Sequence, residues 1–121
     1  MSEVLLVEDS PIYQEIIANL LKRNGWKVVI VRDGLEALEQ MQKSYPDLVV
    51  LDIVMPRMNG YEVCRHLKND PKTKNVPVVM CSSRNSTSDR YWGLRNKADA
   101  YISKPFQDLE LVGTIKQLLK R

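Results

Sequence analysis

The chain has 121 residues, 27% of them charged and 44% hydrophobic, and 18 Lys and Arg against 15 Asp and Glu give a formal net charge of +3. This length suits one domain, which we expect to cover residues 1–121. Because no apolar run approaches the ~20 residues that span a bilayer and the first residues lack a secretory signal, we expect a cytoplasmic protein that does not insert into a membrane.

Five short segments rich in Val, Leu, Ile and Met predict β-strands. Their nearly continuous apolar character predicts that each strand is buried on both faces. The segments lie at residues 4–7, 28–31, 48–53, 77–81 and 100–102.

The stretches that follow these strands carry apolar residues at three- and four-residue spacing, which predicts helices. The first helix should begin after Ser10 as N-cap, with Pro11 at its first position and Gly25 just past its end. The pattern weakens in the third and fourth helices and is clear in the last. The apolar stripes comprise Ile16, Ile17, Leu20 and Leu21; Leu35, Leu38 and Met41; Tyr61, Cys64 and Leu67; Tyr91 and Leu94; and Leu111, Val112, Ile115, Leu118 and Leu119.

The alternation of strand and helix, repeated five times, predicts an α/β fold with a parallel sheet and helices on both faces. All strands then run in the same direction, so their C-terminal ends gather at one edge. Open α/β sheets bind their ligands at that edge.

Polar side chains follow four of the predicted strands, at Glu8 and Asp9, at Asp52, at Ser82 and at Lys104. Three carboxylates brought together require a cation to remain ionised, and oxygen donors of this kind suit Mg²⁺. A metal ion and a lysine around a strand-end carboxylate would fit an incoming phosphoryl group, with a serine hydroxyl as hydrogen-bond donor. Asp52 would then be the nucleophile.

Each of these residues alone has an ordinary structural explanation. Asp9 could be a charge at a helix N-terminus, Ser82 a turn residue and Lys104 a surface lysine. Asp52 is harder to explain in this way, because it closes an apolar run where a buried strand would continue. The coincidence of four strand ends favours a functional site.

The residues at these strand ends resemble the receiver domain of two-component response regulators, the CheY-like family. The resemblance covers essentially the whole chain and implies a flavodoxin-like, doubly wound (βα)5 fold with strand order 2-1-3-4-5. It is carried by residues 4–10 (VLLVEDS), 47–56 (DLVVLDIVMP) with Asn59 and Gly60, 77–83 (PVVMCSS) and 98–106 (ADAYISKPF).

The resemblance implies that Asp52 accepts a phosphoryl group from a histidine kinase or a phosphotransfer domain. It further implies that Asp9, Asp52 and the backbone carbonyl of Val54 bind Mg²⁺ directly. Glu8 would act on the metal mainly through water.

The resemblance also assigns roles to residues of the last two strands. Ser82 stands at the hydroxyl switch position, Tyr101 at the aromatic switch position and Lys104 at the invariant-type lysine, whose peptide bond to Pro105 is usually cis. Tyr101 could instead be a plain packing aromatic. The residues at the pocket mouth that would keep it open or tune the lifetime of the phosphoryl group are Val54, Ser83 and Arg84.

Phosphorylation would add about 1.5 to 2 negative charges to the crevice, draw Ser82 toward the phosphoryl group and turn Tyr101 inward. The output surface would be the fourth helix, fifth strand and fifth helix, roughly residues 88–119, which would contact an unknown downstream protein. Residues 84–121 carry a net charge of +4 and the rest −1. This excess could favour an acidic docking site, although ordinary surface scatter explains it as well, and without a dense basic run we expect no direct nucleic-acid binding.

Two departures from the family pattern lie on this expected output surface. Lys97 stands where the family usually has glycine, and Trp92 is bulky for its helix. Residues 89–95 (DRYWGLR) resemble receivers of pilus-driven twitching motility, which points to motility or taxis. We expect a stand-alone receiver, either a monomer or a phosphorylation-dependent dimer.

Other functions stay open alongside this one. A Mg²⁺-dependent phosphohydrolase with an aspartate nucleophile would need an acid two residues after Asp52, where the chain has Val54. A flavodoxin-type carrier would need a phosphate cradle that the acidic first loop lacks, and triad catalysis lacks partners for His66. A degenerate receiver that never takes phosphate remains the alternative within the fold. The expectation is a regulator that catalyses only its own phosphotransfer and autodephosphorylation, not an enzyme.

Overall fold

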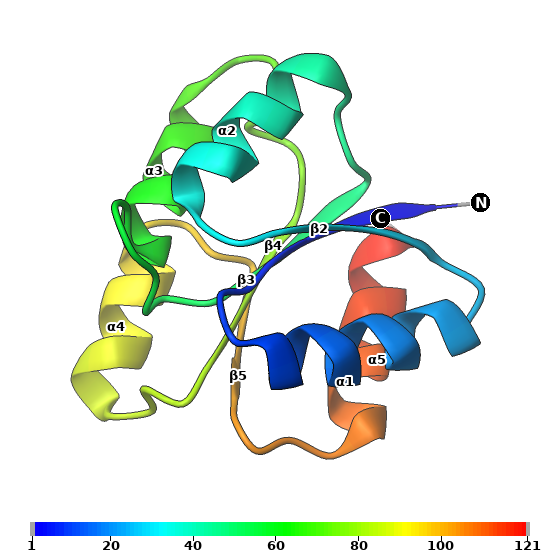
Figure 1. Ribbon diagram of the computed structural model, residues 1–121. Coiled ribbons are helices and arrows are strands. Elements are labelled where there is room, and N and C mark those ends of the chain that lie inside the picture. The colour runs from blue at the N-terminus through cyan, green and yellow to red at the C-terminus, as the bar shows by residue number, and fades with distance from the viewer. Residues whose placement is uncertain (1, 121) are drawn as a thin grey trace.

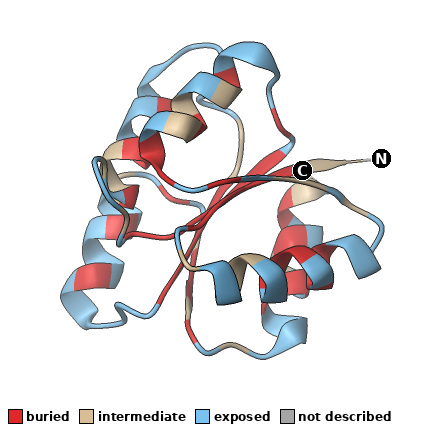
Figure 2. Cartoon of the chain, in the orientation of Figure 1, coloured by how far each residue is buried: buried red, intermediate tan, exposed pale blue. Residues whose placement is uncertain are grey.

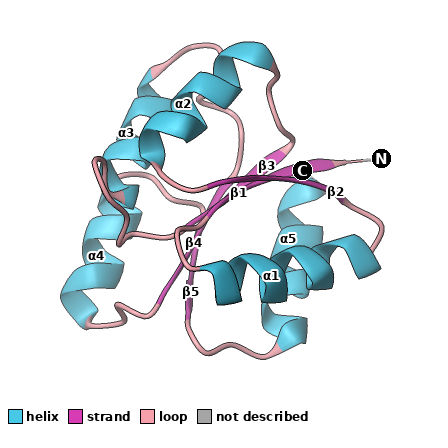
Figure 3. Cartoon of the chain, viewed as in Figure 1, coloured by secondary structure: helices cyan, strands magenta, loops and turns pink. Residues whose placement is uncertain are grey.

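A five-stranded parallel sheet lies between two layers of helices in the computed structural model, which describes residues 2–120 (Figure 1). The ends of the expected domain, residues 1 and 121, lie outside the described residues. The strand order β2-β1-β3-β4-β5 confirms the expected flavodoxin-like arrangement (Figure 3). The elements are β1 (Glu3–Val7), α1 (Pro11–Arg23), β2 (Lys27–Val31), α2 (Gly34–Lys43), β3 (Leu48–Leu51), α3 (Gly60–Asn69), β4 (Val78–Ser82), α4 (Thr87–Arg95), β5 (Ala100–Ser103) and α5 (Asp108–Leu119).

The third strand ends two residues earlier than the sequence predicts, at Leu51. Asp52 N still donates to Val7 O at 3.1 Å, which continues the pairing with β1 by one bond. The Asp52 side chain then accepts the Ile53 N–H at 2.6 Å, so the backbone leaves the sheet there. The chain therefore turns at the residue that the sequence singles out.

The two faces of the sheet bury two separate apolar clusters, because successive side chains of a strand point to opposite faces. Val4 and Leu6 pack with α1 and α5, whereas Leu5 and Val7 pack with α2 and α3. Figure 1 shows α1 and α5 together on one side of the sheet and α2, α3 and α4 on the other. β1, β3 and β4 lie inside the sheet between these layers, as expected for buried parallel strands.

The prediction of burial on both faces is wrong for β2. This strand lies at the edge of the sheet, Lys27 is exposed and Ile30 is 40% exposed (Figure 2). Apolar composition alone does not distinguish an edge strand from a central one.

The apolar stripe expected for the fourth helix is also wrong. Tyr91 and Leu94 are each 55% exposed, and the buried residues of α4 are Asp89 and Gly93. A Cβ atom on Gly93 would lie 2.9 Å from the Tyr101 ring, so the helix packs on the sheet through its smallest residue. Two members of other stripes, Ile16 and Leu35, are exposed as well.

The described residues include no helix of the length and apolarity that a membrane crossing requires.

Candidate functional site

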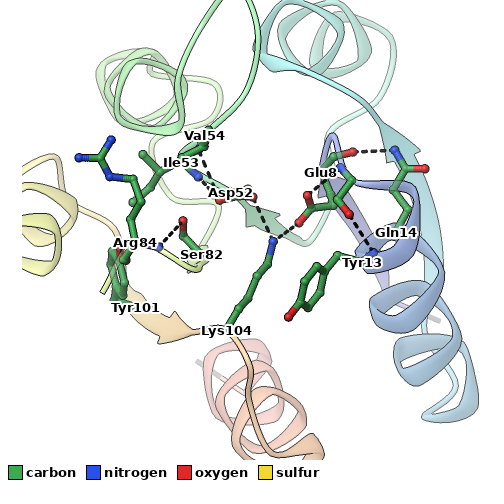
Figure 4. Close-up of polar contacts among 11 residues, drawn as sticks. Glu8, Tyr13, Gln14, Asp52, Ile53, Val54, Ser82, Arg84, Tyr101 and Lys104 are labelled. Carbon is green, nitrogen blue, oxygen red and sulfur yellow. Dashed lines mark hydrogen bonds and ion pairs between the residues drawn. The ribbon is translucent and has the colours of Figure 1, made fainter. Parts of the chain in front are cut away.

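Three charged side chains meet at the C-terminal edge of the sheet, one after each of three strands. Lys104 Nζ lies 2.5 Å from Glu8 Oε1 and 3.0 Å from Asp52 Oδ2 (Figure 4). Glu8, Asp52 and Lys104 are only 2%, 8% and 7% exposed. Residues that are 96 and 52 positions apart in the chain thus form one buried ionic cluster.

The backbone that follows Asp52 fixes the orientation of its carboxylate. Oδ1 accepts the N–H of Ile53 at 2.6 Å and that of Val54 at 3.4 Å, which leaves Oδ2 for Lys104. The β3–α3 loop, residues 53–59, then closes where Gly60 N donates to Ile53 O at 2.9 Å. A Cβ atom on Gly60 would lie 2.8 Å from the Ile53 Cα, so only glycine lets α3 begin this close to the site.

The start of α1 holds Glu8 and covers Lys104. Ser10 N donates to Glu8 Oε2 at 3.0 Å, and Gln14 Nε2 donates to the Glu8 carbonyl at 2.6 Å. The Tyr13 ring centroid lies 4.2 Å from Lys104 Nζ, within the range of a cation–π interaction. Sequence reasoning missed Tyr13 and Gln14, although a helix that begins directly after the acidic pair must place its first turn beside the strand ends.

Two carboxylates share one ammonium group, which leaves the cluster with an uncompensated negative charge. Burial raises the pKa of the Glu8 carboxyl, and the hydrogen bond from Lys104 opposes this effect. Burial alone would lower the pKa of Lys104, but the hydrogen bond to Glu8 and the charge of Asp52 outweigh it and raise that pKa. Lys104 is therefore a permanent cation in the site.

The oxygen atoms of Asp9, Asp52 and the Val54 carbonyl are the kind of ligand that a hard divalent cation prefers. Asp9 adjoins the cluster in sequence and is exposed, and Val54 is 56% exposed at the start of the β3–α3 loop. Within the part of the chain that the structure describes, no group of three His, Cys, Asp or Glu side chains is placed to hold a metal. Mg²⁺ needs no such cage, because it keeps several waters and takes one or two carboxylates. Glu8 binds Lys104 directly, so the structure places it as the partner of the lysine.

Ser82 ends β4, the strand that pairs with β3, and is fully buried. Its Oγ accepts the N–H of Arg84 at 3.2 Å, a bond that does not use the hydroxyl hydrogen. The Arg84 side chain binds Asp89 at 3.2 Å rather than the cluster. Ser83 is exposed.

Tyr101 is 9% exposed and belongs to the apolar cluster under α2 and α3. Its hydroxyl donates to the Arg84 carbonyl, and the Arg90 guanidinium lies 5.2 Å from the ring centroid. The aromatic side chain is thus in an inward position, bonded to the segment that follows Ser82 (Figure 4). The peptide bond between Lys104 and Pro105 is cis.

The remaining candidate groups lie away from the cluster or are chemically inert. His66 is exposed on α3. Burial raises the pKa of Cys64 to about 11 and that of Cys81 to about 12, and both are free thiols. Neither cysteine is poised as a nucleophile.

Comparison with known proteins identifies the family to which this fold belongs. The sequence profile of the response regulator receiver domain matches residues 4–116. The chain belongs to the response regulator receiver family. It is therefore a receiver of two-component systems, a class of signalling regulators that work through phosphorylation.

Individual relatives agree with this assignment. The receiver is 38% identical over 118 residues to the phosphate regulon transcriptional regulatory protein PhoB of Escherichia coli, covering 98% of this chain and 52% of PhoB. It thus spans about half the length of the curated relatives that it matches.

Two solved receivers share its structure closely. The receiver domain of a signal transduction histidine kinase from Syntrophus aciditrophicus has a TM-score of 0.94 and 36% identity, with 99% of this chain and 91% of that chain covered. The receiver domain of the sensor histidine kinase PA1611 from Pseudomonas aeruginosa has a TM-score of 0.92 and 28% identity, with 99% and 98% covered. That structure has a magnesium ion coordinated in its active-site cleft.

Proposed function

We propose that Asp52 accepts a phosphoryl group from the phosphohistidine of a histidine kinase or a phosphotransfer domain. The observation that carries this proposal is the buried Asp52 carboxylate at the open edge of the sheet, with Lys104 Nζ 3.0 Å from Oδ2. In the transfer, a new bond forms between an Asp52 oxygen and phosphorus, the bond between phosphorus and the histidine nitrogen breaks, and the nitrogen keeps the electron pair. The chain acts as a phospho-accepting regulator that catalyses only this transfer and its own dephosphorylation.

The residues of the cluster divide the work of the transfer. The N–H groups of Ile53 and Val54 orient the Asp52 carboxylate, so little reorganisation is needed at the moment of reaction. Lys104 supplies a fixed positive charge for the phosphoryl oxygens, and Ser82 can donate its hydroxyl hydrogen to one of them.

Magnesium is the metal that we propose for this site, held by Asp9, Asp52 and the carbonyl of Val54. Oxygen donors beside an uncompensated negative charge support this assignment, as does the magnesium ion of the PA1611 receiver. When bound, Mg²⁺ would supply charge neutralisation at the phosphoryl oxygens. Because Glu8 binds Lys104 directly, we propose that it positions the lysine and contacts the metal mainly through water.

The output proposal rests on Tyr101. Its inward position and its bond to the Arg84 carbonyl link the segment after Ser82 to the surface of α4 and β5. A phosphoryl group that attracts the Ser82 hydroxyl would change the stability of the bond between Tyr101 and the Arg84 carbonyl. It would thereby shift the relative populations of the Tyr101 side-chain positions. The face formed by residues 88–119 would then bind an unknown downstream protein, as a monomer or as a phosphorylation-dependent dimer. Motility or taxis as the pathway stays a prediction from residues 89–95.

Intact-mass measurement tests the acceptor directly. Incubation with Mg²⁺ and acetyl phosphate should add the mass of one phosphoryl group to the wild-type protein and none to Asp52→Asn. Asp9→Asn should lower the extent of modification at a given Mg²⁺ concentration. Asp108→Asn, an exposed carboxylate on α5, is the matched control and should behave as wild type. A wild-type protein that gains no mass would support the degenerate receiver and overturn the proposal.

A further inference from the structure

One ion pair ties the β3–α3 loop to the N-terminus of α2. Arg57 of the loop donates twice to Asp33 Oδ2, from Nη2 at 2.5 Å and from Nε at 3.1 Å. The Asp33 side chain is 7% exposed and that of Arg57 is 54% exposed. The carboxylate is therefore an anchor inside the protein, and the guanidinium reaches to it from the loop.

Asp33 is held rigidly because both of its oxygens are engaged. Its Oδ1 accepts the N–H of Glu36 at 3.0 Å and so caps α2. The backbone hydrogen bond from Glu36, followed by the side-chain hydrogen bond from Arg57, holds the pKa of this carboxyl below its usual range. The anchor is thus ionised at neutral pH.

The backbone of the β3–α3 loop is constrained at Arg57 as well. Arg57 has φ 68°, a left-handed conformation that glycine adopts far more easily than arginine. The neighbouring Met58 lies against Gly34 at the start of α2, because a Cβ atom there would come within 2.9 Å of the Met58 side chain. Two adjacent residues of the loop therefore dock on the same end of α2.

We propose that the Arg57–Asp33 pair is a positioning device that preorganises the β3–α3 loop for metal binding and so raises the Mg²⁺ affinity of the receiver. The loop directly follows Asp52 and carries Val54, so the inference rests on the proposed function of these two residues. The side-chain bonds of Arg57 go to Asp33 and not to Glu8, Asp52 or Lys104, so the pair acts through the loop. Without the pair, metal binding must also order residues 53–59, which lowers affinity.

The test uses variants that retain the fold. Asp33→Asn keeps an N-cap side chain for α2 and removes the charge, and Arg57→Gln removes the other partner. Arg57→Lys restores a point charge and should recover part of the loss. Arg32→Gln is the matched control, because Arg32 binds Glu36 of α2 with two bonds of 3.1 and 3.2 Å but does not contact the loop.

Two readouts that need no phosphoryl donor are measured on each protein. The first is the Mg²⁺ dissociation constant from amide chemical-shift titration. The second is hydrogen exchange of the loop amides without metal. Each single variant should raise the dissociation constant by up to about fivefold, because a pair that acts only through loop order changes affinity by no more than it stabilises the ordered loop. Loop amides should exchange about fivefold faster, the effect of a partly exposed ion pair.

The double variant decides whether the two residues act together. With Asp33→Asn and Arg57→Gln combined, the dissociation constant should rise no further than in either single variant. Multiplied losses, or values equal to those of Arg32→Gln, would overturn the inference. If the wild-type protein binds no Mg²⁺, the proposed metal site fails instead. Hydrogen exchange then still decides the inference, because unchanged loop exchange in both single variants would overturn it.

Discussion

Replacing Lys97 with glycine should stabilise the protein, because Lys97 ends α4 in a conformation that favours glycine. Its φ is 71°, in the left-handed region. The N–H groups of Lys97 and Ala98 bond to the carbonyls of Leu94 and Gly93 at 2.9 and 3.1 Å, which closes the helix end.

The end of α1 has the same geometry with glycine at the corresponding position. Gly25 has φ +87°, and the N–H groups of Gly25 and Trp26 bond to the carbonyls of Lys22 and Leu21 at 3.0 and 3.3 Å. One chain therefore contains both versions of the same helix end. The glycine that the resemblance leads us to expect at the position of Lys97 would suit this backbone geometry.

The magnitude follows from two opposing effects. A left-handed conformation costs a non-glycine residue roughly 1–2 kcal/mol. Glycine loses more conformational entropy on folding, which offsets about 0.5–1 kcal/mol. Lys97→Gly should thus raise the free energy of unfolding by about 0.5–1 kcal/mol, which corresponds to a Tm about 2–4 °C higher.

Urea unfolding followed by circular dichroism measures this change. The midpoint should rise by about 0.3–0.5 M with an unchanged m-value. Gly25→Ala is the converse control, because no atom lies within 4 Å of the added Cβ and only the backbone conformation is affected. It should lower stability by about 1 kcal/mol. An unchanged or lower midpoint for Lys97→Gly would refute the reasoning and show that the lysine side chain stabilises the fold.

Three further predictions follow from individual contacts. Gly60→Ala should destabilise the protein by about 1–3 kcal/mol in urea unfolding, since its Cβ would lie 2.8 Å from a backbone Cα of the β3–α3 loop; an unchanged midpoint would contradict this. Cys64 and Cys81, whose pKa values burial raises to about 11 and about 12, should resist a thiol reagent at pH 8 until the protein unfolds, and rapid labelling of the native protein would contradict this. The bonds from Glu36 and the adjacent guanidinium lower the pKa of Asp33, so its stabilising effect is present above its unfolded pKa of about 4 and is lost as pH falls. Asp33→Asn should therefore flatten the fall of the urea midpoint on acidification, and an unaltered pH profile would contradict this.

The parallel sheet and the edge that carries the site could be predicted because they depend on alternation along the chain, whereas the strand order came from the resemblance to the receiver family. The burial predictions for β2 and α4 were wrong because burial depends on partners that lie far away in sequence. Ile30 belongs to β2, an apolar strand at the edge of the described sheet, so no further strand lies on its outer side. α4 packs through Gly93 because the Tyr101 ring occupies the adjoining space, which no periodicity in residues 87–95 could reveal.

The cluster shows the same division. The positions of Asp52 and Lys104 followed from strand ends, and the structure brings them together. The direct pairing of Glu8 with Lys104 could not be predicted in this way, because the backbone conformation at the end of β1 decides which of the two adjacent acids points into the crevice. Glu8 is buried and Asp9 exposed, and the docking of Tyr13 over Lys104 depends on how α1 lies against the sheet.

The central claim is that Asp52 is the residue that carries the phosphoryl group. After incubation with Mg²⁺ and acetyl phosphate, borohydride reduces an aspartyl phosphate to homoserine, which marks the acceptor permanently. Peptide mass mapping should then find homoserine at position 52 alone, and none in protein that was not incubated with the donor. Homoserine at another carboxylate, or at none, would contradict the account.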